Sequence, residues 1–179
     1  DFYKFIEERR PFKVKPIVGC EVYLTENMHV KEKGANGAPP KLNHLVLLAK
    51  NGEGYHNLVK IVSESYTEGM YYKPRVDFDC IKKYSGGLIC LSACLAGVIP
   101  QALLRRDYAT ADMWAERFKE LFGDDFYIEI QNHNIEDQKI VLPRLVELAE
   151  KHGIKTVATN DAHYLTKDDA KMQKVLMAI

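Results

Sequence analysis

Short apolar runs alternate along the chain with longer segments in which apolar residues recur at helical spacing. The runs are rich in β-branched and aromatic residues or alternate apolar with polar positions, a pattern typical of strands. They predict strands over residues 15–24, 44–49, 87–92, 126–131 and 155–159. Apolar positions three or four residues apart predict helices over 2–10, 54–66, 108–122, 135–152 and 167–178.

Strands and helices therefore alternate, and no two-residue turn joins neighbouring strands directly. This order predicts a parallel α/β sheet or barrel. Residues 26–41 are polar and contain Gly and Pro, which indicates a flexible excursion between the first two strands. Pro100 fits the first turn of one more helix. Pro143 predicts a kink or a late start in the helix over 135–152.

Composition limits the range of functions. With 179 residues, 46% of them hydrophobic, the chain can form one sizeable core and a single domain. Its 25 basic and 25 acidic residues balance, which does not favour a globally basic nucleic-acid clamp but leaves a local basic site open. No apolar run reaches the ~20 residues of a membrane span, and no signal peptide is visible. The four cysteines form no C-x-x-C pair, which favours reduced thiols and a cytoplasmic location.

Residues of metal-binding type fall near the ends of the predicted strands. Asp161 and His163 follow the last strand, and alternation in an extended chain sends both side chains to the same side. Glu21, Cys94 and His133 also fall at strand ends, whereas His44 fits less well because it begins its strand. The carboxyl ends of parallel strands meet at one edge, where α/β folds bind ligands. A mixed set of nitrogen, oxygen and sulfur donors suits zinc or a zinc and manganese cluster better than magnesium alone.

Each candidate also has an ordinary structural explanation. Asp161 could form an Asx-turn with a surface histidine beside it, Cys94 could be a small buried residue, and Glu21 could sit at an exposed strand end. From the residues alone, a metal site and these structural roles both remain open.

A second candidate is the aromatic and basic segment from Tyr71 to Arg75. Tyr72, Lys73 and Arg75 could contact nucleic acid, with the ring stacking on bases and the cations neutralising phosphates. The alternative is a loop anchored by its tyrosines, and physical reasoning alone favours that alternative.

Six segments resemble, in order, the motifs of the PHP (polymerase and histidinol phosphatase) domain, in the version carried by bacterial DNA polymerase III alpha subunits. The likeness runs across nearly the whole chain. The segments are Gly19–Tyr23, His44–Asn51, Gly69–Asp77, Cys90–Leu95, Tyr127–His133 and Thr159–Tyr164.

The resemblance implies a distorted (βα)7-type barrel with a multinuclear site for zinc or manganese, or magnesium, at its mouth. It implies phosphodiester cleavage at the 3′ end of DNA by a metal-activated water, as in a proofreading 3′–5′ exonuclease. Asp161 and His163 would belong to the catalytic centre, with no separate general base assigned, and His133 would support the ligands without binding metal. The implied metal ligands are Glu21, His44, Cys94, Asp161 and His163.

The chain departs from the family at its start. The early His-x-His and Thr-Asp-His motifs are absent, and Asp1-Phe-Tyr-Lys resembles the helix just beyond them. The polymerase palm, thumb and fingers are absent as well. We therefore expect residues 1–179 to be a single PHP-domain fragment that lacks the first βα units and is inactive alone. An open parallel edge would invite self-association, which a clean monomer in sedimentation at high concentration would contradict.

The parent protein implied by the resemblance is a DNA-directed DNA polymerase of bacterial DNA replication. Its partners would be DNA and other replicase subunits, including a proofreading subunit. One alternative is a non-catalytic scaffold that supports the polymerase and the proofreading subunit. A second is a stand-alone metal-dependent phosphatase, which the Tyr71–Arg75 segment argues against.

Overall fold

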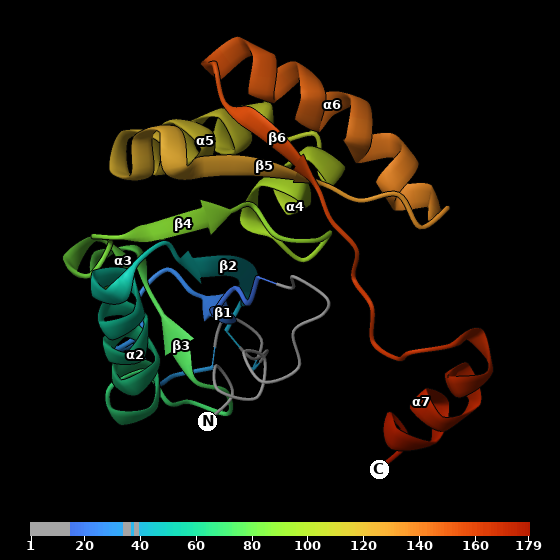
Figure 1. The fold of residues 1–179 in the computed structure, drawn as a ribbon, viewed down its shortest axis with the longest axis horizontal. Coiled ribbons are helices and arrows are strands. Elements are labelled where there is room, and N and C mark those ends of the chain that lie inside the picture. The colour runs from blue at the N-terminus through green and yellow to red at the C-terminus, as the bar shows by residue number, and fades with distance from the viewer. Residues whose placement is uncertain (1–14, 34–36, 38–39) are drawn as a thin grey trace.

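A computed structural model describes residues 15–33, 37 and 40–179. Its centre is a six-stranded sheet with the order β3-β1-β2-β4-β5-β6 (Figure 1). The helix expected over residues 2–10 lies outside the described residues. The strands are β1 (Gly19–Leu24), β2 (Asn43–Ala49), β3 (Arg75–Val76), β4 (Leu88–Leu91), β5 (Phe126–Ile130) and β6 (Lys155–Ala158).

Strand β2 runs against all the others. It pairs antiparallel with β1 and with β4, whereas β1 pairs parallel with β3, and β4, β5 and β6 pair parallel with one another. The expectation of a wholly parallel sheet was therefore wrong. Parallel neighbours need a crossover back to the starting edge, usually through a helix. Here β1 ends and β2 begins at the same edge, because the two strands are antiparallel neighbours.

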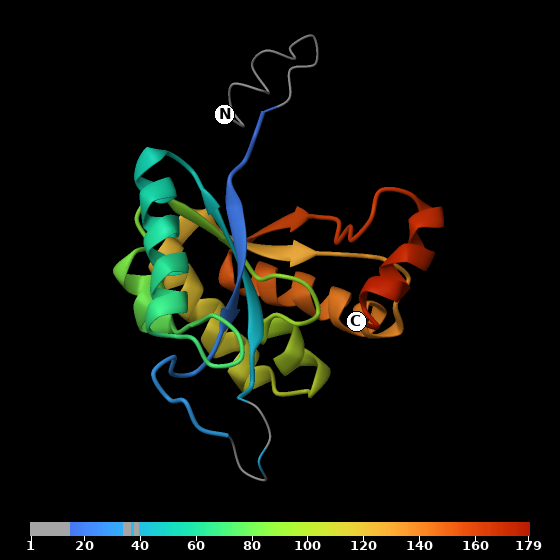
Figure 2. The same cartoon turned by 90° about the horizontal axis from the view of Figure 1, so that it is seen from below.

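Helices pack along one face of the curved sheet (Figure 1). Helix α2 contacts β1 to β4, while α5 and α6 contact β4, β5 and β6. Figure 2 shows that the chain leaves the sheet after β6 and that the last helix lies apart from it. The helices are α2 (Gly52–Thr67), α3 (Phe78–Lys83), α4 (Val98–Leu104), α5 (Tyr108–Phe122), α6 (Glu136–His152) and α7 (Ala170–Leu176), with 3-10 turns η2 (Gly123–Asp125) and η3 (Lys167–Asp169).

Alternation along the strands separates the core from the site. Leu45 and Leu47 of β2 and Ile128 of β5 are fully buried among the helices. Their neighbours along the same strands, such as His44 and Glu129, lie on the opposite face of the sheet. Successive side chains of a strand point to opposite sides. The core forms under the helices, so polar groups are free to gather on the other face.

Local sequence signals explain several helix boundaries. Asn51, Asp77 and Asp107 accept hydrogen bonds from backbone N–H groups in the first turns of α2, α3 and α5. Gly153 ends α6 in the left-handed conformation. Pro143 lies inside α6, which begins at Glu136, so the late start is excluded and the other predicted alternative, a kink, stays a prediction. In the part of the chain that the structure describes, no helix is long and apolar enough to cross a membrane.

Candidate metal and phosphoester site

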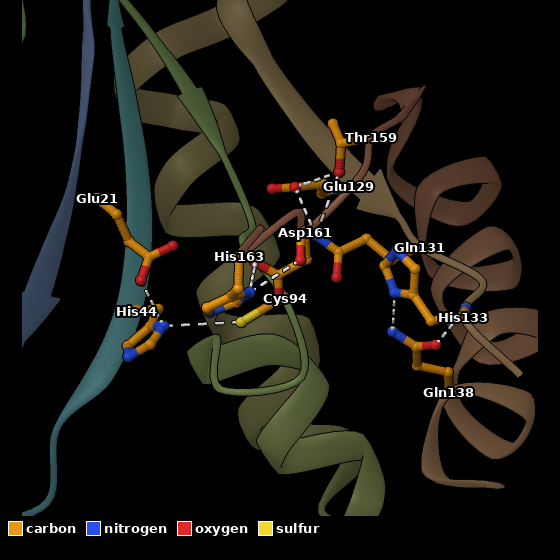
Figure 3. Close-up of polar contacts among 10 residues, drawn as sticks. All are labelled: Glu21, His44, Cys94, Glu129, Gln131, His133, Gln138, Thr159, Asp161 and His163. Carbon is orange, nitrogen blue, oxygen red and sulfur yellow. Dashed lines mark hydrogen bonds and ion pairs between the residues drawn. The ribbon is translucent and has the colours of Figure 1, made fainter. Parts of the chain in front are cut away.

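The predicted site residues gather at one edge of the sheet, the edge where β1, β3, β4, β5 and β6 end. Cys94 follows β4, His133 follows β5, and Asp161 and His163 follow β6. His44 joins them because β2 runs in the opposite direction, so that the start of β2 lies at this edge. His44 therefore lies at the same edge as the other candidates although it is near the start of its strand. Figure 3 shows the side chains of these residues lying near one another.

Glu21 lies inside β1 rather than at its end, where it was expected, and it forms one contiguous group with His44 and Cys94. Glu21 Oε1 lies 2.7 Å from His44 Nδ1, and Cys94 Sγ lies 3.6 Å from the same nitrogen (Figure 3). The side chains of Glu21 and His44 are 48% and 26% exposed, so Glu21 is paired but not buried. A carboxylate can only accept, so Nδ1 of His44 donates to Glu21. In the neutral ring, Nε2 then keeps the lone pair.

The loop after β4 holds Cys94 over His44. Ala93 has a positive φ of 65°, which turns the chain sharply at the strand end. Ala96 then accepts hydrogen bonds from the backbone N–H of His44 at 3.0 Å and from the Asn43 side chain at 3.1 Å. These bonds tie the loop to the start of β2, and the placement of Cys94 follows from them.

Asp161 and His163 form a second group. The ring Nδ1 of His163 lies 2.9 Å from the Asp161 carbonyl oxygen and 3.8 Å from its carboxylate. A carbonyl oxygen can only accept, so Nδ1 carries the proton and Nε2 keeps its lone pair. His163 therefore has the tautomer that a metal ligand through Nε2 requires.

Cys94 belongs to the first group and also lines the cleft that contains the second group. Cys94, Asp161 and His163 line one cleft of about 670 Å³, together with Gln131 and His133. Within residues 15–33, 37 and 40–179, no three His, Cys, Asp or Glu side chains are arranged to bind one metal ion. The donors fit zinc or manganese in chemistry and in placement at one edge, but the described residues do not preassemble a site.

Electrostatics at Cys94 favour a cation. Burial is the main cause that raises the pKa of the Cys94 thiol, and the carboxylates of Asp161 and Glu21 raise it further, while a backbone hydrogen bond from Ala96 acts in the opposite direction. The thiol therefore stays protonated when only carboxylates are near. A bound cation reverses this balance and favours the thiolate, which is the form that ligates metals.

Glu129 is a polar residue of this edge that the sequence interpretation did not nominate. It is 6% exposed, and its Oε1 accepts hydrogen bonds from Gln131 Nε2 at 3.0 Å and from the Thr159 hydroxyl. Its other oxygen, Oε2, is buried without a hydrogen-bond partner among the described residues. A buried carboxylate oxygen is costly unless a donor or a cation neutralises it. The available signal was an acidic residue on the polar face of a strictly alternating strand.

His133 is held by the first turn of α6. Its backbone N–H donates to Gln138 Oε1 at 2.7 Å, and its Nδ1 lies 3.0 Å from Gln138 Nε2. His133 lines the cleft beside Asp161 and His163. Its predicted supporting role stays a prediction.

The aromatic and basic segment divides into an exposed and a buried part. Tyr72 is 71% exposed and Lys73 is also exposed, whereas Arg75 is only 1% exposed. The Arg75 guanidinium donates to the carbonyls of Gly69, Met28 and Val30 and lies 5.2 Å from the Tyr71 ring. Arg75 thus faces the protein rather than a phosphate, which favours the tyrosine-anchored loop at that position.

Comparisons of the sequence with known proteins identify its family. The sequence model of the PHP domain matches residues 1–133. The DNA polymerase III subunit alpha of Borreliella burgdorferi is 43% identical over 176 residues, covering 98% of this chain and 15% of that protein. The same subunit of Aquifex aeolicus is 40% identical over 181 residues (99% and 16%), and that of Thermus aquaticus is 42% identical over 176 residues (98% and 14%). The chain thus spans about 15% of the length of these relatives. It belongs to the PHP domain family.

Proposed function

We propose that this chain is the PHP domain of a replicative DNA polymerase, a DNA-directed DNA polymerase of the polymerase III alpha type. We further propose that the edge described above is a metal-dependent phosphoesterase site that cleaves phosphodiester bonds at a DNA 3′ end. The observation that carries the proposal is the convergence of nitrogen, oxygen and sulfur donors from four strands on one edge. The relatives named above support the polymerase context.

The proposed ligands form two groups. Glu21, His44 and Cys94 belong to the first, and Asp161 and His163 to the second. When bound, zinc or manganese, or magnesium, would supply Lewis acidity toward the phosphoryl oxygens and a more acidic water. The carboxylates of Glu21 and Asp161 would balance the cationic charge, and the two histidines, when neutral, would offer Nε2 because their Nδ1 atoms are engaged.

The residues that the structure describes make up only part of the proposed site. The two ligand groups lie apart in the described residues, with no three donors around one point. We therefore propose that this chain is inactive by itself and that further donors complete the metal cluster, with the sheet extended toward a (βα)7-type barrel. The same observation also fits the alternative in which the domain is a non-catalytic scaffold. An experiment must therefore distinguish a catalytic domain from a scaffold.

The partners follow from the polymerase context. DNA and other replicase subunits, including a proofreading subunit, would contact the parent protein. The exposed Tyr72 and Lys73 remain available for a nucleic-acid contact, whereas Arg75 is engaged with three backbone carbonyls.

The experiment measures 3′ exonuclease activity of the full-length protein after Asp161→Ala. The loss of a ligand removes several kcal/mol of charge stabilisation, so activity should fall by more than ~100-fold while polymerase activity is retained. The matched control is Asp168→Ala, which removes an exposed carboxylate from the 3-10 turn η3 nearby and should change little. Unchanged exonuclease activity in Asp161→Ala would contradict catalysis and support the scaffold.

A further inference from the structure

The contact between His133 and Gln138 determines which nitrogen of His133 carries a proton. Gln138 is 4% exposed, and its amide meets two atoms of the same residue, the backbone N–H and the ring Nδ1 of His133. Amide orientation is usually ambiguous because oxygen and nitrogen look alike. Here the backbone N–H, which can only donate, settles the orientation.

The backbone N–H of His133 needs an acceptor, so Gln138 Oε1 faces it at 2.7 Å. The amide NH2 of Gln138 then faces Nδ1 of His133 at 3.0 Å. Since an NH2 group can only donate, Nδ1 must hold a lone pair, and the proton of the neutral ring resides on Nε2.

This arrangement is the reverse of that at the other two histidines of the edge. His44 and His163 donate from Nδ1, to the Glu21 carboxylate and to the Asp161 carbonyl, and so keep a lone pair on Nε2. His133 accepts at Nδ1 and therefore presents an N–H at Nε2. A ring nitrogen that carries a proton cannot bind a metal, so His133 differs in chemistry from its neighbours.

We infer that His133 is a fixed hydrogen-bond donor for an anionic phosphoryl oxygen of the substrate, and that Gln138 is the residue that positions it. The inference rests on the proposed phosphoesterase function for the identity of the ligand. His133 lines the same cleft as Asp161, His163 and Cys94, so a phosphate bound near those side chains lies beside its ring (Figure 3). Gln138 acts only through His133.

The first test reads the tautomer directly and needs no activity. Nitrogen NMR of the full-length protein, labelled with 15N-histidine and loaded with diamagnetic zinc, is recorded at about pH 8, where ordinary histidines are neutral. His133 should show a protonated Nε2 and an unprotonated Nδ1. In Gln138→Glu the carboxylate can only accept, so a proton should appear on Nδ1. The exposed neighbour on the same helix provides the control, and Asp137→Asn should leave the signals unchanged.

The second test measures binding of thymidine 5′-monophosphate, a phosphate monoester of the expected product class. A hydrogen bond to a charged group corresponds to about 10- to 100-fold in affinity, so His133→Phe should weaken binding by that factor. His133→Gln, which restores an N–H donor at a similar reach, should recover most of the affinity. His56→Phe, an exposed histidine on α2, should bind as the unaltered protein does.

The outcomes separate this inference from the proposed function. A proton on Nδ1 of His133 in the unaltered protein would overturn the inference, as would unchanged nucleotide affinity in His133→Phe or the absence of any binding. If the tautomer and the binding pattern are as expected but no substrate is hydrolysed, the inference stands and the catalytic function fails.

Discussion

At the scale of single residues, a histidine's role at this edge depends on the partner of its Nδ1. A carboxylate or a carbonyl at Nδ1 frees Nε2 as a ligand, as in His44 and His163, whereas the Gln138 amide leaves His133 with a donor. The sequence shows all three histidines but not these partners. Gln138 is five residues from His133 on another element, and Glu21 contacts His44 across two strands.

Arg75 shows the same dependence on surroundings. Beside Lys73 and two tyrosines it has the composition of a nucleic-acid contact, yet it is buried and its guanidinium is bound by carbonyls of two loops. The pattern of charges and rings identifies the segment but does not reveal which cation faces inward.

Replacing Arg75 should therefore destabilise the domain. Arg75→Met removes the donors to Gly69, Met28 and Val30 and leaves the buried carbonyls of Gly69 and Met28 unpaired, which should lower the free energy of unfolding by about 3 kcal/mol. Lys73→Met, at an exposed position of the same segment, should change it by less than ~0.5 kcal/mol. Urea denaturation followed by circular dichroism compares the two variants. An equal change in the free energy of unfolding in the two variants would show that the hydrogen bonds of Arg75 do not stabilise the domain.

At the scale of elements, periodicity predicted the long segments well. Helix α5 has the predicted bounds, and α2, α6 and the strands β2, β4, β5 and β6 differ from prediction by at most two residues at either end. Helix α7 begins at Ala170, three residues later than predicted. Strand β1 begins at Gly19, four residues later than predicted, and β3 and α3 were missed because each is too short to show a period. The direction of β2 could not be predicted, because the chain between β1 and β2 contains no direct turn signal.

Close backbone contact sets the position of α2. A Cβ on Gly54 would lie 1.8 Å from the carbonyl oxygen of Gly87, just before β4, whereas a Cβ on Gly52 would meet nothing within 4 Å. Both glycines lie in the first turn of the same helix, so they form a matched pair.

Alanine at these two positions should have opposite effects. Gly54→Ala forces α2 away from the turn before β4 and should destabilise the domain by about 1–3 kcal/mol. Gly52→Ala should be neutral or stabilising by up to ~1 kcal/mol, because alanine is the better helix former. Thermal unfolding of the two variants checks this difference. A Gly54→Ala protein as stable as Gly52→Ala would show that the contact is relaxed at no cost.

At the scale of the whole molecule, the site exists only because distant segments converge. Glu21 lies within β1 and Cys94 follows β4, far apart in sequence, and the sheet brings both into contact with His44 at the start of β2. The candidate ligands could be chosen from the sequence because strand ends and donor types are readable there. Their separation into two groups, the buried Glu129 and the reversed tautomer of His133 depend on three-dimensional packing and could not.

The most direct test of the account is whether the thiol of Cys94 binds the metal. Zinc K-edge X-ray absorption of the zinc-loaded full-length protein should show a sulfur ligand at about 2.3 Å. The sulfur signal should disappear in Cys94→Ser and persist in Cys20→Ser, a half-buried cysteine next to Glu21 in β1. A zinc shell of nitrogen and oxygen alone in the unaltered protein, or a sulfur shell that survives Cys94→Ser, would contradict a metal site at this edge built with Cys94.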